Sequence, residues 1–203
     1  MSDSTAFFHP TADVAENAAV GNGSKIWHYA QVREDVVMGQ NCIVGRGAYV
    51  GTGVEMGDNC KVQNYALVYE PARLGNGVFI GPAVVLTNDH FPRAINADGS
   101  PKSAADWHPV GVEIREGASI GASATCVAPI TIGRWALVGS GAVVVKDVPD
   151  FALVVGSPAR RIGWVGKAGQ PLTVDPHDPA IYICPATGER YRQTNDHELI
   201  EVA

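Results

Sequence analysis

Residues 44–51 read Val44-Gly45-Arg46-Gly47-Ala48-Tyr49-Val50-Gly51, in which an aliphatic residue followed by glycine occurs twice, six positions apart. The spacing continues in both directions, and a large apolar residue stands at every sixth position from Phe8 to Leu86, fourteen in a row. Seven of the fourteen are followed directly by glycine, which we expect where the chain turns tightly. A six-residue period matches neither a helical face nor a strand face. It predicts short strands joined by regular corners, stacked into a solenoid with one inward aliphatic side chain per hexapeptide.

This pattern of an aliphatic residue, glycine and four variable positions resembles the hexapeptide-repeat acyltransferases. The resemblance implies an all-β chain folded as a left-handed parallel β-helix with triangular coils of three hexapeptides. The handedness comes from the resemblance and not from the period. If one coil holds eighteen residues, positions eighteen apart lie in adjacent coils, about 4.8 Å from one another. The columns of outward side chains can therefore be predicted from the sequence.

The composition favours one domain with a small appendage. The 203 residues carry a net charge of −6, which argues against a general nucleic-acid or anionic-membrane surface. The sequence contains no long uninterrupted apolar stretch of the kind that spans a membrane. The polar start Met1-Ser2-Asp3-Ser4 is unlike a secretory signal, so we expect a cytoplasmic protein. The cysteines lack the paired spacing of a metal site and are expected to be reduced thiols; they are Cys42, Cys60, Cys126 and Cys184.

The repeat is interrupted once. It stops after Leu86 and resumes at Ile114, an interval of twenty-eight residues that is not a multiple of six. The residues between, 87–113, are rich in proline and polar side chains, which predicts a long inserted loop. Ordered loops of this length are usually functional, and Trp107 and His108 are expected to anchor this one.

After six further inward positions the repeat ends in a proline-marked segment, residues 146–161, that resembles the terminal motif of these acyltransferases. A solenoid needs such a cap, because its last coil otherwise leaves an open core and an unpaired strand edge. We therefore expect a β-helix domain over residues 1–165, with the loop at 87–113, and a small extension over residues 166–203.

In related sequences this extension often carries two cysteine pairs like those of a zinc ribbon. Here only Cys184 remains, and one cysteine cannot make a four-ligand zinc site. We predict a remnant without metal, built from two short hairpins around Tyr182 and Tyr191.

Five short motifs narrow the resemblance to one group of acyltransferases. In chain order they are Ile26-Trp27-His28, Val62-Gln63-Asn64, Val68-Tyr69-Glu70, Thr87-Asn88-Asp89-His90-Phe91-Pro92-Arg93 and Val154-Val155-Gly156-Ser157-Pro158-Ala159-Arg160. Together they are similar to the N-acetyltransferases of nucleotide-linked 3-amino sugars. That resemblance implies acetyl-CoA as donor, a UDP- or dTDP-linked amino sugar as acceptor, and active sites between the subunits of a homotrimer. A role in surface-polysaccharide or glycoside biosynthesis follows from it.

Eighteen-residue stacking places Glu70 one coil from Asn88, at the base of the loop. Amide formation from a thioester needs a neutral amine, a stabilised oxyanion and a route for the released proton. Asn88 is the candidate to orient the amine or the thioester, and Glu70 the candidate to take or stabilise the proton. His90 is the alternative base, because histidine titrates near neutral pH. Placement of the reactants alone is the third possibility.

Eighteen-residue spacing also stacks His28 and Asn64 on a different side of the prism from Glu70, with Gln63 adjacent to Asn64. The candidate substrate-binding residues are His28, Arg33, Gln63, Asn64, Tyr69, Asp89 and Arg93. Arg33 and Arg93 suit the diphosphate, because arginine recognises phosphate well. Asp89 is better suited to fixing the loop than to chemistry. All the outward polar residues have an alternative role as a hydrogen-bonded ladder along the prism.

The candidate acetyl-CoA residues lie late in the repeat and in the cap: Gly139, Ser140, Gly141, Lys146, Arg160 and Arg161. Backbone amides at 139–141 would face the pantetheine arm, and the three cations are placed to meet the 3′-phosphate. A solvated end cap is the competing role for these cations.

Three rival classes stay open. An O-acetyltransferase on the same fold would need a histidine paired with a carboxylate, which Asp89-His90 leaves possible. A lyase resembling the γ-type carbonic anhydrases would need two histidines close together on one coil, whereas His28, His90 and His108 are isolated. A non-catalytic scaffold would bind no acetyl-CoA, and the polar cluster at the base of the loop argues against it.

Overall fold

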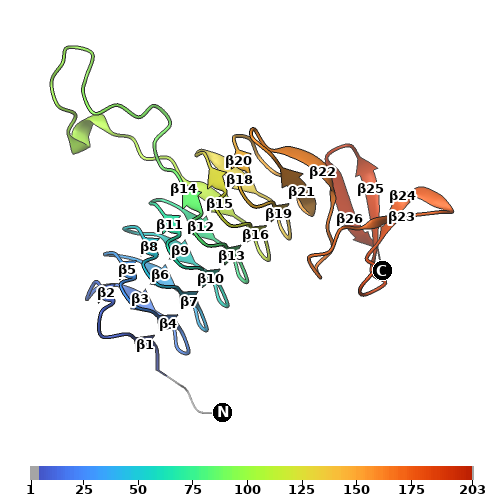
Figure 1. Ribbon diagram of the computed structural model, residues 1–203, viewed down its shortest axis with the longest axis horizontal. Helices are drawn as coiled ribbons and strands as arrows, with labels where there is room; N and C mark the ends of the chain where they lie inside the picture. Colours follow the sequence, from blue (N-terminus) through green and yellow to red (C-terminus); the bar gives the residue numbers. More distant parts are fainter. Residues whose placement is uncertain (1–4, 203) are drawn as a thin grey trace.

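A computed structural model describes residues 5–202 as a parallel β-helix followed by a small antiparallel sheet (Figure 1). The prism has three faces, which we call sheets A, B and C. Sheet A contains β1 (Phe7–Phe8), β4 (Lys25–Ile26), β7 (Ile43–Val44), β10 (Lys61–Val62), β13 (Phe79–Ile80), β16 (Ser119–Ile120), β19 (Leu137–Val138), β21 (Ala152–Val155) and the antiparallel β22 (Arg160–Trp164). Sheet B contains β2 (Asp13–Val14), β5 (Gln31–Val32), β8 (Tyr49–Val50), β11 (Leu67–Val68), β14 (Val85–Leu86), β17 (Thr125–Cys126) and β20 (Val143–Val144). Sheet C contains β3 (Ala19–Val20), β6 (Val37–Met38), β9 (Glu55–Met56), β12 (Arg73–Leu74), β15 (Val112–Ile114) and β18 (Ile130–Ile132).

The strand register confirms the length of the coil. Val44 pairs with Val62, and Val68 pairs with Leu86, each partner eighteen residues further along. The second residue of almost every two-residue strand points inward and is buried, which forms the core predicted from the period. Phe8 begins the series but is 47% exposed, because it belongs to the first described coil. None of the described residues forms a helix long and apolar enough to span a bilayer.

Glycine occurs after the inward residues for a different reason from the tight turn that we expected. Their φ angles are not left-handed; the left-handed residue of a corner comes two positions later, as at Gly47 with φ 63°. Instead, the backbone of the next coil passes directly over them. A Cβ on Gly121 would lie 2.5 Å from the amide nitrogen of Ser140 and 2.8 Å from the carbonyl carbon of Gly139.

We expect Gly121→Ala to lower the free energy of unfolding by about 1–3 kcal/mol, because overpacking against rigid backbone costs that much. The melting temperature measured by calorimetry should fall by roughly 2–12 °C. Gly163→Ala is the matched control, since a Cβ there meets nothing within 4 Å and its φ is not left-handed. Equal melting temperatures for the two variants would contradict the close-contact explanation.

The inserted loop leaves the prism between β14 and β15 and projects away from it (Figure 1). Across the loop Leu74 pairs with Ile114, a spacing of 40 residues where other coils have 18, so the loop adds 22 residues. Its two ends meet, because the Val110 amide donates to the Asn88 carbonyl at 3.1 Å. The loop is therefore an excursion that returns to register.

Short local turns organise the loop. Residues 94–102 form a small hairpin, in which the Lys102 amide donates to the Ala94 carbonyl at 3.1 Å. A single 3₁₀ turn, η1 (Ala104–Asp106), is closed by a capping box from Ser103. Trp107 is half-buried but His108 is exposed, so the expected anchoring by His108 is wrong.

The chain ends in a four-stranded antiparallel sheet of β23 (Thr173–Asp175), β24 (Asp178–Ile183), β25 (Arg190–Asn195) and β26 (Glu198–Val202). The two hairpins expected here are β23–β24, which contains Tyr182, and β25–β26, which contains Tyr191. They join into one sheet because Tyr182 and Tyr191 pair with each other across β24 and β25. Tyr191 is 1% exposed, and its ring meets that of Phe151 edge-on at 5.2 Å. The terminal sheet is thus packed against the last coil. Cys184 is a buried free thiol, and no group of three metal-ligating side chains occurs within residues 5–202.

Candidate active site

The B/C edge of the prism, where the chain passes from sheet B to sheet C, carries the predicted catalytic pair. Val68 pairs with Leu86, so Glu70 and Asn88, each two residues further on, hold equivalent positions in adjacent coils. Tyr69 occupies the neighbouring column. The register thus gives the arrangement predicted for the base of the loop.

The carboxylate of Glu70 turns into the prism edge. Its Oε2 atom is buried and has no hydrogen-bond partner. Among residues 5–202, every other buried side-chain nitrogen or oxygen has a partner. Gly51, one coil earlier, makes room for this carboxylate, because a Cβ there would collide with Oε2 and lie 2.8 Å from the Glu70 amide nitrogen. Burying an unpaired polar oxygen is costly, so this atom is a candidate for contact with a ligand.

Two tyrosines flank Glu70. The rings of Tyr49 and Tyr69 lie 5.1 Å apart and are tilted by 48°. Burial and then the negative charge of Glu70 raise the pKa of the Tyr49 hydroxyl. Tyr49 therefore stays protonated at neutral pH and can donate a hydrogen bond on this edge. Sequence reasoning missed Tyr49, although it lies one coil before Leu67 in β11, three residues from Glu70.

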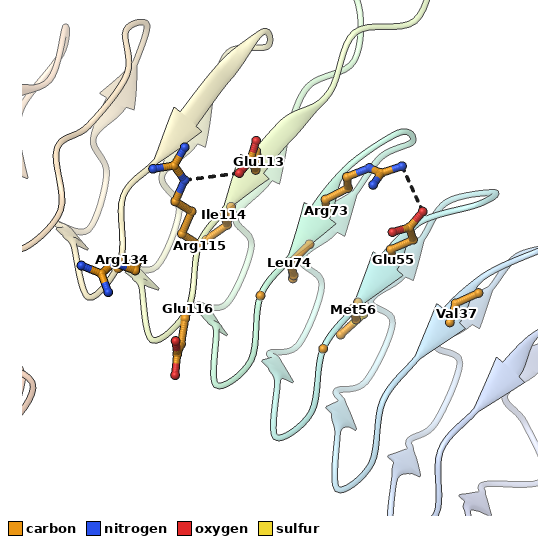
Figure 2. Close-up of a pocket in the computed structure, with 12 residues that line it drawn as sticks. Val37, Glu55, Met56, Arg73, Leu74, Glu113, Ile114, Arg115, Glu116 and Arg134 are labelled. Atoms are coloured by element: carbon orange, nitrogen blue, oxygen red, sulfur yellow. Dashed lines mark hydrogen bonds and ion pairs between the residues drawn. The ribbon is translucent and has the colours of Figure 1, made fainter.

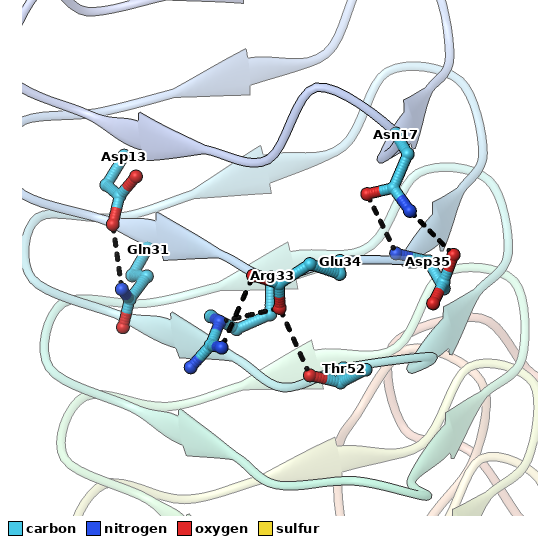
Figure 3. Close-up of polar contacts among 7 residues, drawn as sticks. All are labelled: Asp13, Asn17, Gln31, Arg33, Glu34, Asp35 and Thr52. Carbon is cyan, nitrogen blue, oxygen red and sulfur yellow. Dashed lines mark hydrogen bonds and ion pairs between the residues drawn. The ribbon is translucent and has the colours of Figure 1, made fainter.

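Arg33 also lies on the B/C edge, directly after β5. Its guanidinium donates to both carboxylate oxygens of Glu34, at 2.9 and 3.3 Å, and Thr52 donates to the same carboxylate at 3.4 Å (Figure 3). The hydrogen bond and charge of Glu34 raise the pKa of Arg33. The side chain of Arg33 is held in place, but its N–H donors are engaged by the Glu34 carboxylate. Arg33 is therefore a weaker candidate for binding the diphosphate.

The loop projects away from the prism (Figure 1), and of its predicted site residues Asp89 is half-buried while His90 and Arg93 are exposed. Asp89 accepts a hydrogen bond from the Phe91 amide at 2.9 Å, which fits a role in fixing the loop. The exposed ring of His90 stacks on Phe91 with centroids 4.1 Å apart. Arg93 is exposed, and its side chain donates to the carbonyl of Pro92 at 2.9 Å.

The A/B edge, where the chain passes from sheet A to sheet B, carries the other predicted substrate residues. His28 follows β4 and stacks on His9 with ring centroids 3.4 Å apart. Partial burial and then His28 lower the pKa of His9. Asn64 Oδ1 accepts from the Arg46 amide at 2.9 Å, so it serves the ladder role, and Gln63 precedes it. These residues follow strands of sheet A, and sheet B separates them from the B/C edge.

Two of the predicted acetyl-CoA residues, Lys146 and Arg160, lie on different edges of the prism. Lys146 follows β20 in the column of Asn88, two coils further along. The amide of Ala159 donates to the carbonyl of Val143 at 2.8 Å, which brings the start of β22, and with it Arg160, beside β20. Because Arg160 pairs with Val155 at the end of β21, it lies on the A/B edge, and sheet B separates it from Lys146 on the B/C edge.

The other predicted acetyl-CoA residues are already engaged within the chain. The amides of Gly139 and Gly141 donate to carbonyls of neighbouring segments, at 2.8 Å each. The guanidinium of Arg161 lies 4.1 Å from the ring centre of Trp164. Ser140 is the exception, because its amide donates none of the backbone hydrogen bonds found within residues 5–202.

A wide groove of about 720 Å³ lies on the outer face of sheet C, over β9, β12 and β15 (Figure 2). Sequence reasoning did not single it out, although Glu55 and Arg73 carry opposite charges eighteen residues apart. Arg73 pairs with Glu55 at 3.0 Å, and Arg115 pairs with Glu113 at 3.3 Å. The third cation of the groove, Arg134, pairs with Asp150 at 2.9 Å. Because all three cations are paired with carboxylates, we do not place the diphosphate there.

Comparison with known proteins identifies the family. A model described as Bacterial transferase hexapeptide (six repeats) matches residues 9–52 and 53–88, and one described as Hexapeptide repeat of succinyl-transferase matches 111–146. The interval between the matches coincides with the loop. The dTDP-3-amino-3,6-dideoxy-alpha-D-galactopyranose 3-N-acetyltransferase of Aneurinibacillus thermoaerophilus is 36% identical over 192 residues, 94% of this chain and 93% of the relative. The chain belongs to the hexapeptide-repeat transferases.

Other hexapeptide-repeat transferases match over a shorter range. Serine acetyltransferase 4 of Arabidopsis thaliana is 34% identical over 121 residues, which are 59% of this chain but 33% of the relative. The chain thus spans about a third of the length of that relative. The UDP-N-acetylglucosamine acyltransferase of Francisella novicida shares the fold, with a TM-score of 0.57 and 18% identity over 82% of this chain and 71% of its own. The resemblance drawn from the repeat is confirmed.

Proposed function

We propose that this protein transfers the acetyl group of acetyl-CoA to the amine of a UDP- or dTDP-linked 3-amino-deoxy sugar. The observation that carries the proposal is the 36% identity to a dTDP-3-amino-sugar 3-N-acetyltransferase over 93% of that enzyme. The B/C edge supports it, because a buried carboxylate lies one coil from an amide side chain where the long loop begins. We expect the enzyme to act in the cytoplasm, in the biosynthesis of a surface polysaccharide or glycoside.

Asn88 and Glu70 share the chemistry in this proposal. Asn88 orients the amine or the thioester carbonyl, and Glu70 Oε2 accepts a hydrogen bond from the attacking nitrogen or takes its proton. An amine on a sugar ring is easier to deprotonate than a lysine, because the neighbouring oxygens withdraw electrons. Holding the reactants together therefore supplies much of the acceleration. His90 stays the alternative base, acting from the loop.

We propose a homotrimer in which a second copy completes each site. His28 and Asn64 lie on the A/B edge, whereas Glu70 lies on the B/C edge, with sheet B between them. Setting the A/B edge of one copy against the B/C edge and loop of the next would bring both groups to one substrate. Phe91 is 74% exposed and Ile95 is 54% exposed, which gives the loop apolar side chains to bury in that contact.

Lys146 is proposed to bind the 3′-phosphate of acetyl-CoA, and Arg160, which lies on the A/B edge, is a secondary candidate. Lys146 shares the column of Asn88 and lies two coils away, a distance of roughly 10 Å along the prism. A pantetheine arm that follows the B/C edge would bring the thioester towards Asn88. Ser140 and Arg161 are secondary candidates.

The geometry of Asp89 and His90 in the loop supports acetyl transfer to a hydroxyl less well than acetyl transfer to an amine. A sugar O-acetyltransferase would need Asp89 to polarise His90, because a hydroxyl requires a stronger base than an amine. Asp89 instead accepts from the Phe91 amide, and the His90 ring stacks on Phe91. The amine is therefore the preferred acceptor.

The proposed activity is tested by incubating the protein with acetyl-CoA and a panel of UDP- and dTDP-linked 3-amino sugars while free thiol release is followed. We expect release with at least one amine and a product heavier by one acetyl group in mass spectrometry. The corresponding 3-hydroxy sugars are the matched control acceptors. Absence of thiol release with every amine would refute the function.

A further inference from the structure

The A/B edge contains two large residues in a backbone conformation that suits glycine. At the third position after an inward residue, the chain turns through the left-handed region, as at Gly47 and Gly141. Tyr29 and Tyr65 occupy this position with φ of 58° and 59°. A positive φ is strained for a bulky side chain and persists where the surroundings or the function demand it.

Two other large aromatic residues share this conformation, but packing accounts for them. Phe151 has φ 61° and is 1% exposed beneath the terminal sheet. Trp135 has φ 56° and packs against the core. Tyr29 and Tyr65, in contrast, are 60% and 56% exposed. Burial within the described chain therefore does not compensate for the strain of Tyr29 and Tyr65, in contrast to Phe151 and Trp135.

The surroundings of the two tyrosines are cationic and polar. The guanidinium of Arg46 lies 5.1 Å from the ring centre of Tyr29. The ring of Tyr65 lies against Gly47, where a Cβ would come within 2.6 Å of its Cε1 atom. His28 precedes Tyr29 in the chain, and their ring centroids lie 6.5 Å apart. His9 stacks on His28 on the same edge. The edge thus combines two exposed tyrosine rings with the guanidinium of Arg46 and the ring nitrogens of two histidines.

We propose that Tyr29, Arg46 and Tyr65 form the subsite for the nucleoside diphosphate part of the substrate, which we call the tyrosine subsite. The tyrosine rings stack on the planar base, and Arg46 faces the diphosphate. Stacking on aromatic side chains and pairing with arginine are how proteins hold exposed bases and phosphates. This inference rests on the proposed function, and it adds three residues to the edge that already carries His28 and Asn64.

The test uses Tyr65→Gly, which removes the ring and supplies the residue that the left-handed turn favours. We expect a melting temperature equal to or above that of the wild type, together with at least tenfold weaker binding of free UDP or dTDP in calorimetry. Ala83→Gly is the matched control, because Ala83 occupies the same column with φ 55°. It should share the stability gain and leave nucleotide binding unchanged. Arg46→Ala should weaken binding without the stability gain.

Several results would overturn the subsite. Wild-type protein that binds neither UDP nor dTDP would do so, as would Tyr65→Gly and Arg46→Ala variants that bind them as the wild type does. Dissociation of the assembly with nucleotide affinity preserved would make the edge a subunit contact instead. The binding arm is separate from catalysis. Acetyl transfer by the wild type with an unaltered KM in Tyr65→Gly would refute the subsite alone. Tyr65-dependent dTDP binding without transfer to any amine would refute the proposed function alone.

Discussion

Asn88→Ala is expected to lower kcat by roughly 10²–10³-fold, the loss typical of removing one group that orients reactants or stabilises developing charge. The fold should survive, because the loop is closed by the backbone carbonyl of Asn88, which accepts from the Val110 amide, and not by its side chain. Steady-state thiol release measures the loss, and light scattering after size exclusion measures the assembly. A variant with near wild-type kcat would exclude Asn88 from the chemistry.

Two further substitutions separate the candidate bases. Glu70→Gln keeps the shape of the side chain and removes its charge, so a loss of at least about tenfold is expected if the carboxylate takes or stabilises the proton. His90→Ala leaves the prism untouched, because His90 lies on the exposed loop. If His90→Ala retains near-full activity, the base role of His90 must be abandoned. If it abolishes activity while Glu70→Gln does not, the roles assigned to the two residues are reversed.

Deleting residues 89–110 is expected to abolish activity, a fall of at least roughly 10³-fold, while leaving a folded β-helix. The deletion removes the 22 residues by which the 40-residue spacing exceeds an 18-residue coil. It joins Asn88 to Gly111, so glycine falls at the left-handed position of the corner and Ile114 falls six residues after Leu86. Circular dichroism and calorimetry measure the fold, and thiol release measures the activity.

The stability part of this prediction follows from the burial of the loop. Every residue from 87 to 111 is exposed or half-buried, so the deletion removes little of the core. Phe91→Ala combined with Ile95→Ala is the companion variant, because it keeps the length of the loop and removes its most exposed apolar side chains. Full activity of the deletion variant would show that the loop takes no part in the site. Collapse of the fold would contradict the view of the loop as a separate excursion.

The prism was predictable because its six-residue period can be read directly from the order of residues in the sequence. One inward residue every six positions determines the coil, and the coil determines that Glu70 lies one turn from Asn88. The cause of the repeated glycines was not predictable from the period. It depends on how closely adjacent coils approach, as at Gly121 below Ser140, and only the backbone geometry reveals that.

The site was predictable in part. The columns were correct, and so was the expectation that His28 and Asn64 lie on a different side of the prism from Glu70. The same column arithmetic would have found Tyr49 and Gly51 beside Glu70. The path of the loop was not predictable in detail, because its residues follow local turns such as the capping box of Ser103 and not a period.

The hydrogen bond from the Val110 amide to the Asn88 carbonyl closes the loop where it leaves the prism. Coils below and above the loop are therefore stacked as if it were absent, with Leu74 in register with Ile114. Mutations, insertions and deletions inside the loop can accumulate over evolution without disturbing the stacked frame.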